Sequence, residues 1–223
     1  MKEGKRTCLV VALITVTMLS KERCAFANGD TQFWQTTIAS FDLNPGWSIA
    51  IEEHLKIAHD AGDLYYHHTD LGFVYKSLAK WMDLSFNYKQ VFKKDDDRHW
   101  EWENRPHLNV MLREQLGTFD IFNRLRLEYR DRENSRDIWR YTHLLKVTLP
   151  FELTKYKLRP YVADQIFVNL EGKAFDKNRI YSGLSCDLFK KVKVQFCYIY
   201  QSSKPDGQWE DLNALGLLFG IRF

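Results

Sequence analysis

Polar and apolar residues alternate along most of this chain, in segments of about ten residues. The clearest segment is 124–130, where arginine or glutamate stands at every second position and leucine or tyrosine stands between them. The same alternation recurs in 69–76, 82–92 and 105–115. A period of two is typical of a β-strand with one polar and one apolar face, so we expect strands along most of the chain.

Eleven segments are predicted to be strands: 32–43, 47–59, 66–76, 82–93, 105–116, 119–131, 138–149, 157–170, 178–188, 192–202 and 212–223. Alternating segments of about ten residues, separated by turns, are typical of barrels that cross a membrane. The expected fold is therefore all-β, a transmembrane antiparallel up-and-down β-barrel of about 10–12 strands. Because bacterial single-chain barrels usually have an even strand number, we expect one misassignment, with 32–43 incomplete or another strand divided.

A soluble β-sandwich would alternate in the same way, and the two ends of the chain favour the membrane barrel. The last strand carries an apolar stripe that ends in an aromatic carboxy-terminus: Leu215, Leu217, Phe219, Ile221 and Phe223. This ending resembles the signal by which outer-membrane barrels are recognised for insertion. We therefore expect Phe219, Ile221 and Phe223 to engage the barrel-insertion machinery.

The amino-terminus has the pattern of a secretory signal. Lys2, Lys5 and Arg6 precede an apolar run over 8–19, and Ala25-Phe26-Ala27 follows it. The run is too short for a spanning helix, which needs about 20 residues. We expect residues 1–27 to be removed after about Ala27 and residues 28–223 to form one barrel domain in the outer membrane of a Gram-negative bacterium.

Removal of this signal changes the charge balance. It carries five of the 32 basic and two of the 29 acidic residues, which leaves 27 of each in the mature chain. No nucleic-acid partner is therefore expected. Cys186 and Cys197 remain, on successive strands whose register places them apart, so no disulfide is expected. The expected partners are outer-membrane lipids and lipopolysaccharide, and the oligomeric state is left open.

The predicted connections alternate in length. The connections at 44–46, 77–81 and 116–118 are short, whereas those at 93–104, 131–137 and 202–211 are longer. Short turns usually face the periplasm and long loops the exterior. Trp47, Trp81 and Trp139 are interpreted as members of aromatic girdles at the two membrane interfaces.

The most charged face of the predicted barrel points into its lumen. We assign to this charge ladder Arg113, Arg124, Arg126, Glu128, Arg130, Arg140, Asp164 and Arg179. Such a ladder either lines a narrow pore for small solutes or fills the interior. The strand number lies between the eight strands that side chains fill and the 16 that leave a channel, so both hypotheses stay open.

An enzyme of the outer leaflet, of the lipid A deacylase or phospholipase type, is the alternative from another class. It would need a nucleophile and a base at the outer rim. The candidates are His54, His59, His67, His68, His99, His107, His143, Ser135, Ser182, Ser185, Ser202 and Ser203. No spacing among them matches a triad motif, and the catalytic residues stay unknown.

No metal or cofactor is expected. His67 and His68 are adjacent on a strand, so they point to opposite faces and do not form one site with His59 and Asp60. The segment 93–104 carries Asp95, Asp96, Asp97, Glu101 and Glu103, whose oxygens suit calcium or magnesium shared with lipopolysaccharide phosphates. A solvated charged loop is the simpler interpretation and is favoured.

Several segments resemble a bacterial family, domain of unknown function 2490. They are Trp34 with Thr36 and Thr37, 71–75, 123–130, 160–169, and Asn178-Arg179 before Gly183-Leu184. Two positions depart from the family pattern, because Asp164 replaces a glutamate and His54 stands where an arginine is expected. The resemblance implies an outer-membrane barrel and carries no assigned activity.

Overall fold

The computed structural model describes residues 31–58, 63–172, 174–189, 191–204 and 207–223. The predicted signal segment 1–27 and its cleavage site lie outside these ranges. Within them, no helix is long and apolar enough to span a membrane.

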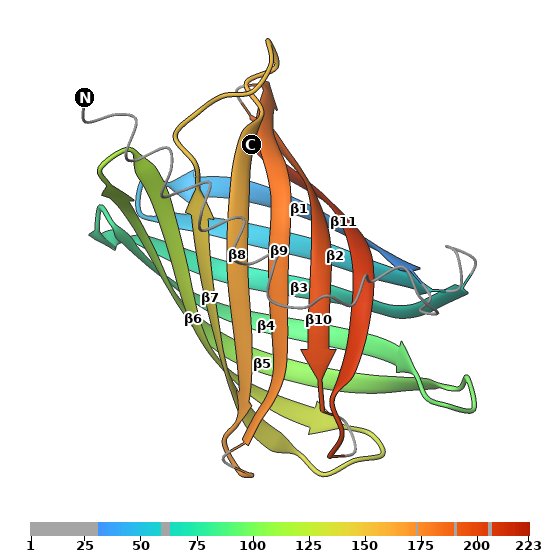
Figure 1. Ribbon diagram of the computed structural model, residues 1–223. Coiled ribbons are helices and arrows are strands. Elements are labelled where there is room, and N and C mark those ends of the chain that lie inside the picture. Colours follow the sequence, from blue (N-terminus) through green and yellow to red (C-terminus); the bar gives the residue numbers. More distant parts are fainter. Residues whose placement is uncertain (1–30, 59–62, 173, 190, 205–206) are drawn as a thin grey trace.

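Eleven strands form one closed barrel, shown in Figure 1. They are β1 (Thr31–Asn44), β2 (Trp47–Ala58), β3 (Asp63–Ala79), β4 (Met82–Lys94), β5 (Trp100–Leu116), β6 (Phe119–Arg132), β7 (Ile138–Thr148), β8 (Arg159–Asn169), β9 (Ala174–Phe189), β10 (Val192–Ser203) and β11 (Glu210–Arg222). The all-β barrel prediction is confirmed. The expectation of one misassigned strand is wrong, because the segment 32–43 is the full strand β1.

The barrel closes through a parallel pair. β1 and β11 run side by side from Thr31↔Asn213 to Ser40↔Arg222, whereas every other neighbouring pair is antiparallel. An odd number of alternating strands makes the first and last strands run the same way, so only a parallel pairing can close the ring. The prediction of a wholly antiparallel barrel is therefore corrected at this seam.

The two rims differ in their connections. At one rim, which we call the short-turn rim, two-residue turns follow β1, β3 and β5, and the carboxy-terminus lies at this rim. The opposite, long-loop rim carries the connections 95–99 and 133–137. The segment 149–158, which contains a Leu153↔Leu158 bridge, is a long connection at the short-turn rim, an exception to the expected division between short and long connections.

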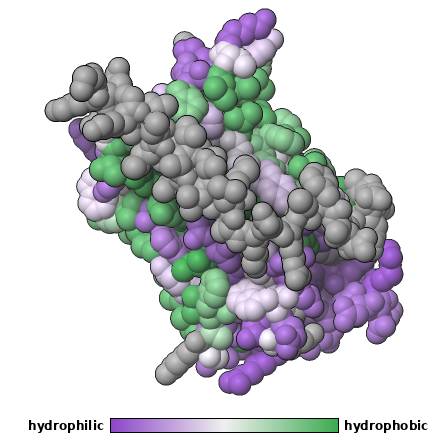
Figure 2. Space-filling model, in the orientation of Figure 1, coloured by the Kyte–Doolittle hydropathy of each residue, from purple (hydrophilic) through white to green (hydrophobic). Residues whose placement is uncertain are grey.

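Side chains alternate between a lipid-type exterior and a polar interior. Phe73, Phe86 and Leu108 are exposed on the outside, whereas Asn109 and Glu128 are buried inside. In Figure 2 apolar residues run along the barrel wall, and hydrophilic residues gather near the loop between β4 and β5. Exposed tryptophans stand at both rims: Trp47 and Trp81 at the short turns, and Trp100, Trp139 and Trp209 at the long loops. Two aromatic belts around an apolar wall are the pattern of an outer-membrane barrel.

The two described cysteines lie where the sequence placed them. Cys186 is opposite Val194 and Cys197 is opposite Gly183 in the antiparallel pair β9–β10. Both thiols are free. Cys197 belongs to a small apolar cluster inside the barrel, together with Trp34, Tyr161, Ile199 and Ala214.

Candidate functional site in the barrel lumen

The inward face of β6 carries the centre of the charged lumen. Arg126, Glu128 and Arg130 occupy alternate positions, and the antiparallel register places Glu128 opposite His107 on β5 and Arg140 on β7. Because side chains at paired positions point to the same side of a sheet, the three strands present their charges to one another.

Two buried carboxylates hold this part of the lumen together. Arg140 Nε donates to Glu128 Oε1 at 2.5 Å. Glu103, on β5, accepts from Arg130 Nη2 at 3.0 Å and from Arg105 Nη2 at 2.8 Å. Charge-assisted bonds of this kind satisfy groups that are costly to bury alone.

A second set of titratable groups lines the wall formed by β2 to β5. Lys89 Nζ lies 3.2 Å from Asp70 Oδ2, and His107 Nε2 lies 3.4 Å from the same oxygen. On β2, Glu52 Oε1 is 2.9 Å from His68 Nε2. The charged layer therefore extends around about half of the barrel.

The lumen is filled at this level. The exposed fraction is 0% for Glu103, 1% for Glu128, 2% for Thr142 and 3% for Trp34. These residues come from β5, β6, β7 and β1, and Ala214 on β11 is also fully buried. Because inward side chains all around the ring are sealed from water, the described barrel holds a packed layer across its interior.

Other members of the predicted ladder lie at different levels. Arg113, near the short-turn rim, pairs with Asp83 through Nη1 and Oδ2 at 2.5 Å. Arg124 points inward, and its buried Nε has no hydrogen-bond partner among the residues that the structure describes. Arg179, towards the long-loop rim, donates from Nε to Gln201 Oε1 at 2.7 Å. The structure thus brings Arg126, Glu128, Arg130 and Arg140 together and separates Arg113 from them.

Asp164 does not belong to the ladder. It is exposed on the outer face of β8, between the buried and inward-facing Ala163 and Gln165, and it accepts a bond from Asn178 Nδ2 at 2.6 Å. The expectation that it faces the lumen is corrected, because the strand alternation places its side chain outside.

The residues of the predicted insertion signal lie on the outward parity of β11. Phe223 is 56% exposed and stacks on Phe41 of β1, with ring centroids 4.7 Å apart. Its backbone N–H donates to Ser40 O at 2.8 Å. The last residue is thus attached to β1 across the parallel seam.

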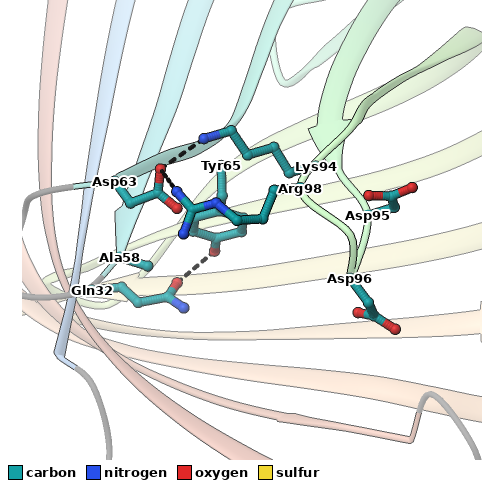
Figure 3. Close-up of a pocket in the computed structure, with 8 residues that line it drawn as sticks. All are labelled: Gln32, Ala58, Asp63, Tyr65, Lys94, Asp95, Asp96 and Arg98. Carbon is teal, nitrogen blue, oxygen red and sulfur yellow. Dashed lines mark hydrogen bonds and ion pairs between the residues drawn. The ribbon is translucent and has the colours of Figure 1, made fainter.

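A pocket of about 410 Å³ opens at the long-loop rim, and Figure 3 shows the side chains that line it. Asp63 Oδ1 pairs with Lys94 Nζ at 2.7 Å and with Arg98 Nη2 at 3.0 Å. Asp95 and Asp96 lie on the other side of the pocket, on the loop that follows β4.

The sequence matches a family model described as "Protein of unknown function (DUF2490)" over residues 31–211. The chain belongs to this family. No curated protein matches it. Among solved structures, the barrel is similar to LpxR from Salmonella typhimurium, with a TM-score of 0.52 and 7% sequence identity. The match covers 83% of this chain and 87% of that chain. At this identity the likeness concerns the fold alone.

Several lumen residues were missed by sequence reasoning. Glu103 was assigned to a loop because it closes an acidic run, whereas β5 begins at Trp100 and carries Glu103 into the interior. Lys56, Asp70 and Lys89 lie on inward faces of strands that were predicted correctly. Alternation had placed Asp70 and Lys89 on the polar faces of their segments without assigning them to the ladder, and extending it from the buried Ser48 would have added Lys56.

The acidic residues of 93–104 separate into different environments. Glu101 pairs with Lys93 at 2.9 Å, and Glu103 is inside the barrel. Asp95, Asp97 and His99 offer ligand atoms within 4.8 Å of one another, so these three can hold a metal ion. His99 also donates its backbone N–H to Asp95 Oδ1 at 2.7 Å, which is an ordinary loop contact.

The described histidines lie on both sides of the wall. His67 stacks on Phe92 outside, whereas His68 binds Glu52 inside, as expected for neighbours on one strand. His54 Nδ1 lies 2.7 Å from Thr36 Oγ1, within the lumen. Among the hydrogen bonds of the described residues, none joins a histidine ring to a serine hydroxyl. His59 and Asp60 lie outside the described ranges.

Proposed function

We propose that this protein is an envelope protein of the outer membrane of a Gram-negative bacterium, with a lumen that is closed in its resting state. The observation that carries the proposal is the buried layer around Glu103 and Glu128, which water does not reach. An open solute pore needs a continuous water-filled path. The packed layer favours the structural role over the pore.

Opening this layer would cost free energy. Separating Glu128 from Arg140 would leave two charges inside the barrel without their partners, and losing one partner of a buried pair typically costs about 3–5 kcal/mol. The eleven strands enclose an interior that long arginine side chains can fill. The ladder therefore acts as a plug.

The proposal also covers export of the chain and its insertion into the membrane. The chain is exported by the segment 1–27, which is cleaved after about Ala27, and the insertion machinery recognises β11 through Phe219, Ile221 and Phe223. The apolar wall then faces lipid. The tryptophans of the long-loop rim contact the lipopolysaccharide headgroup region. These steps are supported by the outward stripe of β11 and by the aromatic belts.

The lipid-modifying alternative has no comparable support. The Thr36–His54 pair is a hydroxyl–imidazole contact, but it lies inside the packed lumen, beneath Trp34. An enzyme of the outer leaflet needs such a pair where a lipid can reach it.

A planar bilayer measurement tests the closed lumen. We expect the refolded protein to insert without steady current steps, and the double variant Glu128→Ala/Arg140→Ala to conduct because it removes both members of the buried pair that closes the lumen. Asp187→Asn, in an exposed pair at the short-turn rim, serves as the control and should stay silent. Steady current steps from the unmodified protein would refute the proposal and support the pore.

A further inference from the structure

Three neighbouring cations of β2 and β9, inside the long-loop half of the barrel, form no ion pair within 4.0 Å with a carboxylate of the described residues. Lys56 Nζ lies 3.7 Å from the centroid of the Trp34 ring, and Lys177 Nζ lies 5.9 Å from that of Phe167. The hydrogen bond of Arg179 to a described side chain goes to the neutral Gln201. Elsewhere in the lumen ion pairs are frequent, but these three side chains form none within 4.0 Å with the residues that the structure describes. We call Lys56, Lys177 and Arg179 the upper cation cluster.

Two aromatic rings keep the cluster together. The Arg179 guanidinium lies 4.8 Å from the Trp34 ring centroid and 5.0 Å from that of Phe167. Lys56 contacts the same Trp34 ring, and Lys177 the same Phe167 ring. Cation–π contacts of this kind orient the cations but do not neutralise their charge. The three positive charges therefore converge on one part of the lumen.

Two of the three neighbouring carboxylates are already engaged. Glu103 forms ion pairs with Arg105 and Arg130, and Glu128 forms one with Arg140. Asp176 is adjacent to Lys177 in the chain, yet no ion pair within 4.0 Å joins them, and its buried Oδ1 has no hydrogen-bond partner in the described part of the chain. Asp176 offsets at most one of the three positive charges, so the described residues leave the cluster with a net positive charge. Buried charges of one sign are expensive unless a counter-charge joins them.

We propose that the upper cation cluster binds an anion of the phosphate class. A phosphate monoester carries up to two negative charges and three acceptor oxygens, which suits two ammonium groups and one guanidinium. A carboxylate has only one charge and would leave the cluster positive. The inference goes beyond the proposed envelope role, and it holds whether or not the lumen conducts.

The pocket at the long-loop rim gives the anion a route. Ala58 and Gln32 line this pocket, and each stands two residues along its strand from Lys56 and Trp34 respectively, on the same inward face. Gln32 Oε1 accepts from Trp34 Nε1 at 2.9 Å, which joins the pocket to the cluster. Asp95 and Asp96 make their side of the pocket unfavourable for an anion, so we place the anion at the side of Gln32 and Ala58, next to the cluster.

Thermal unfolding of the full chain in phospholipid-free detergent micelles tests the proposal. Inorganic phosphate should raise the unfolding midpoint above that in chloride at equal ionic strength. The variant Lys56→Gln/Lys177→Gln should unfold at a higher temperature than the unmodified protein in chloride, because repulsion is relieved. Its apparent affinity for phosphate should fall by about tenfold or more. Lys155→Gln/Lys157→Gln, on the connection at the short-turn rim, removes the same two charges for comparison.

The double variant should thus have a higher unfolding midpoint in chloride but a lower affinity for phosphate. These opposite changes distinguish an anion site from a purely structural role of the two lysines. Equal midpoints of the unmodified protein in phosphate and chloride would overturn the inference, and so would a double variant that keeps the full response to phosphate. If the double variant does not fold, Arg179→Gln gives the same comparison.

Two probes then identify the source of the phosphate. Short-chain phosphatidic acid and glycerol phosphate present the same headgroup with and without acyl chains. Tighter binding of phosphatidic acid, lost in the double variant, assigns the site to a lipid headgroup. Equal affinities assign it to a soluble phosphate ester. Binding of neither probe would refute the site.

Discussion

Arg140 and Glu128 face each other on β7 and β6, and their side chains meet inside the barrel with Nε 2.5 Å from Oε1. Both side chains are almost fully buried. The pair joins two neighbouring strands in the middle of the packed layer, so it contributes both to stability and to closure of the lumen.

Removing one member of this pair should destabilise the barrel. Glu128→Gln leaves the buried Arg140 without its counter-charge, which we expect to lower the free energy of unfolding by about 3–5 kcal/mol. Urea-induced unfolding in lipid vesicles measures this change. Asp187→Asn breaks the exposed pair with Lys193 and should cost less than about 1 kcal/mol. Similar losses for both variants would contradict the structural role of the buried pair.

Gly183 permits a close approach of β9 and β10. A Cβ at this position would lie 2.6 Å from Cys197 Cβ and would also clash with the carbonyl oxygen of Phe196. Gly183→Ala should therefore lower the free energy of unfolding by about 1–3 kcal/mol. Gly220→Ala is the matched control, because its Cβ would meet Lys193 atoms at 3.8 Å, an ordinary contact. The same unfolding measurement compares the two, and equal effects would refute the packing argument.

The terminal phenylalanine should act through recognition as well as packing. Phe223→Ala removes both the aromatic terminus and its stack on Phe41, whereas Phe41→Ala removes the stack alone. We expect the fraction of heat-stable, membrane-inserted protein in cells to fall strongly for Phe223→Ala and only slightly for Phe41→Ala. Equal losses would mean that the stack, and not recognition of the terminus, explains the effect.

The loop 133–137 should show a defined acid response. A hydrogen bond from the Arg132 backbone N–H, with a second from the Tyr129 hydroxyl, lowers the pKa of Asp137 below its ordinary 3.8. The carboxylate therefore stabilises the loop above its unfolded pKa, and this support is lost as pH falls through the lowered value. An NMR titration should give a midpoint below 3.8 that rises in Tyr129→Phe. Tyr141→Phe, on the neighbouring strand, should leave it unchanged, and no rise in Tyr129→Phe would contradict the assignment.

Much of the fold was predictable because alternation is a local property. The strict order of charge and leucine in 124–130 placed β6 and its inward arginines correctly. The predicted start of β5 was wrong because the acidic residues before Asn104 have the composition of a solvated loop. In the structure Glu103 is part of β5 and is paired inside the barrel.

The remaining errors have non-local causes. In β8 the adjacent Asp164 and Gln165 are both polar, so composition does not say which of them faces the lumen. The parallel seam follows from the odd strand count. One strand more or less would make the first and last strands antiparallel. The upper cation cluster comes from β2 and β9, which are distant in sequence and meet only across the closed barrel.

Water access at the centre of the lumen tests the closed barrel most directly. Thr142→Cys, in a Cys186→Ser/Cys197→Ser background, places one thiol at a position that is 2% exposed. Ser135→Cys, in the loop 133–137, is the accessible control. In folded protein reconstituted in vesicles, a water-soluble thiol reagent should label Ser135→Cys rapidly and leave Thr142→Cys unmodified until the barrel is unfolded. Rapid labelling of both in the folded state would contradict the closed lumen.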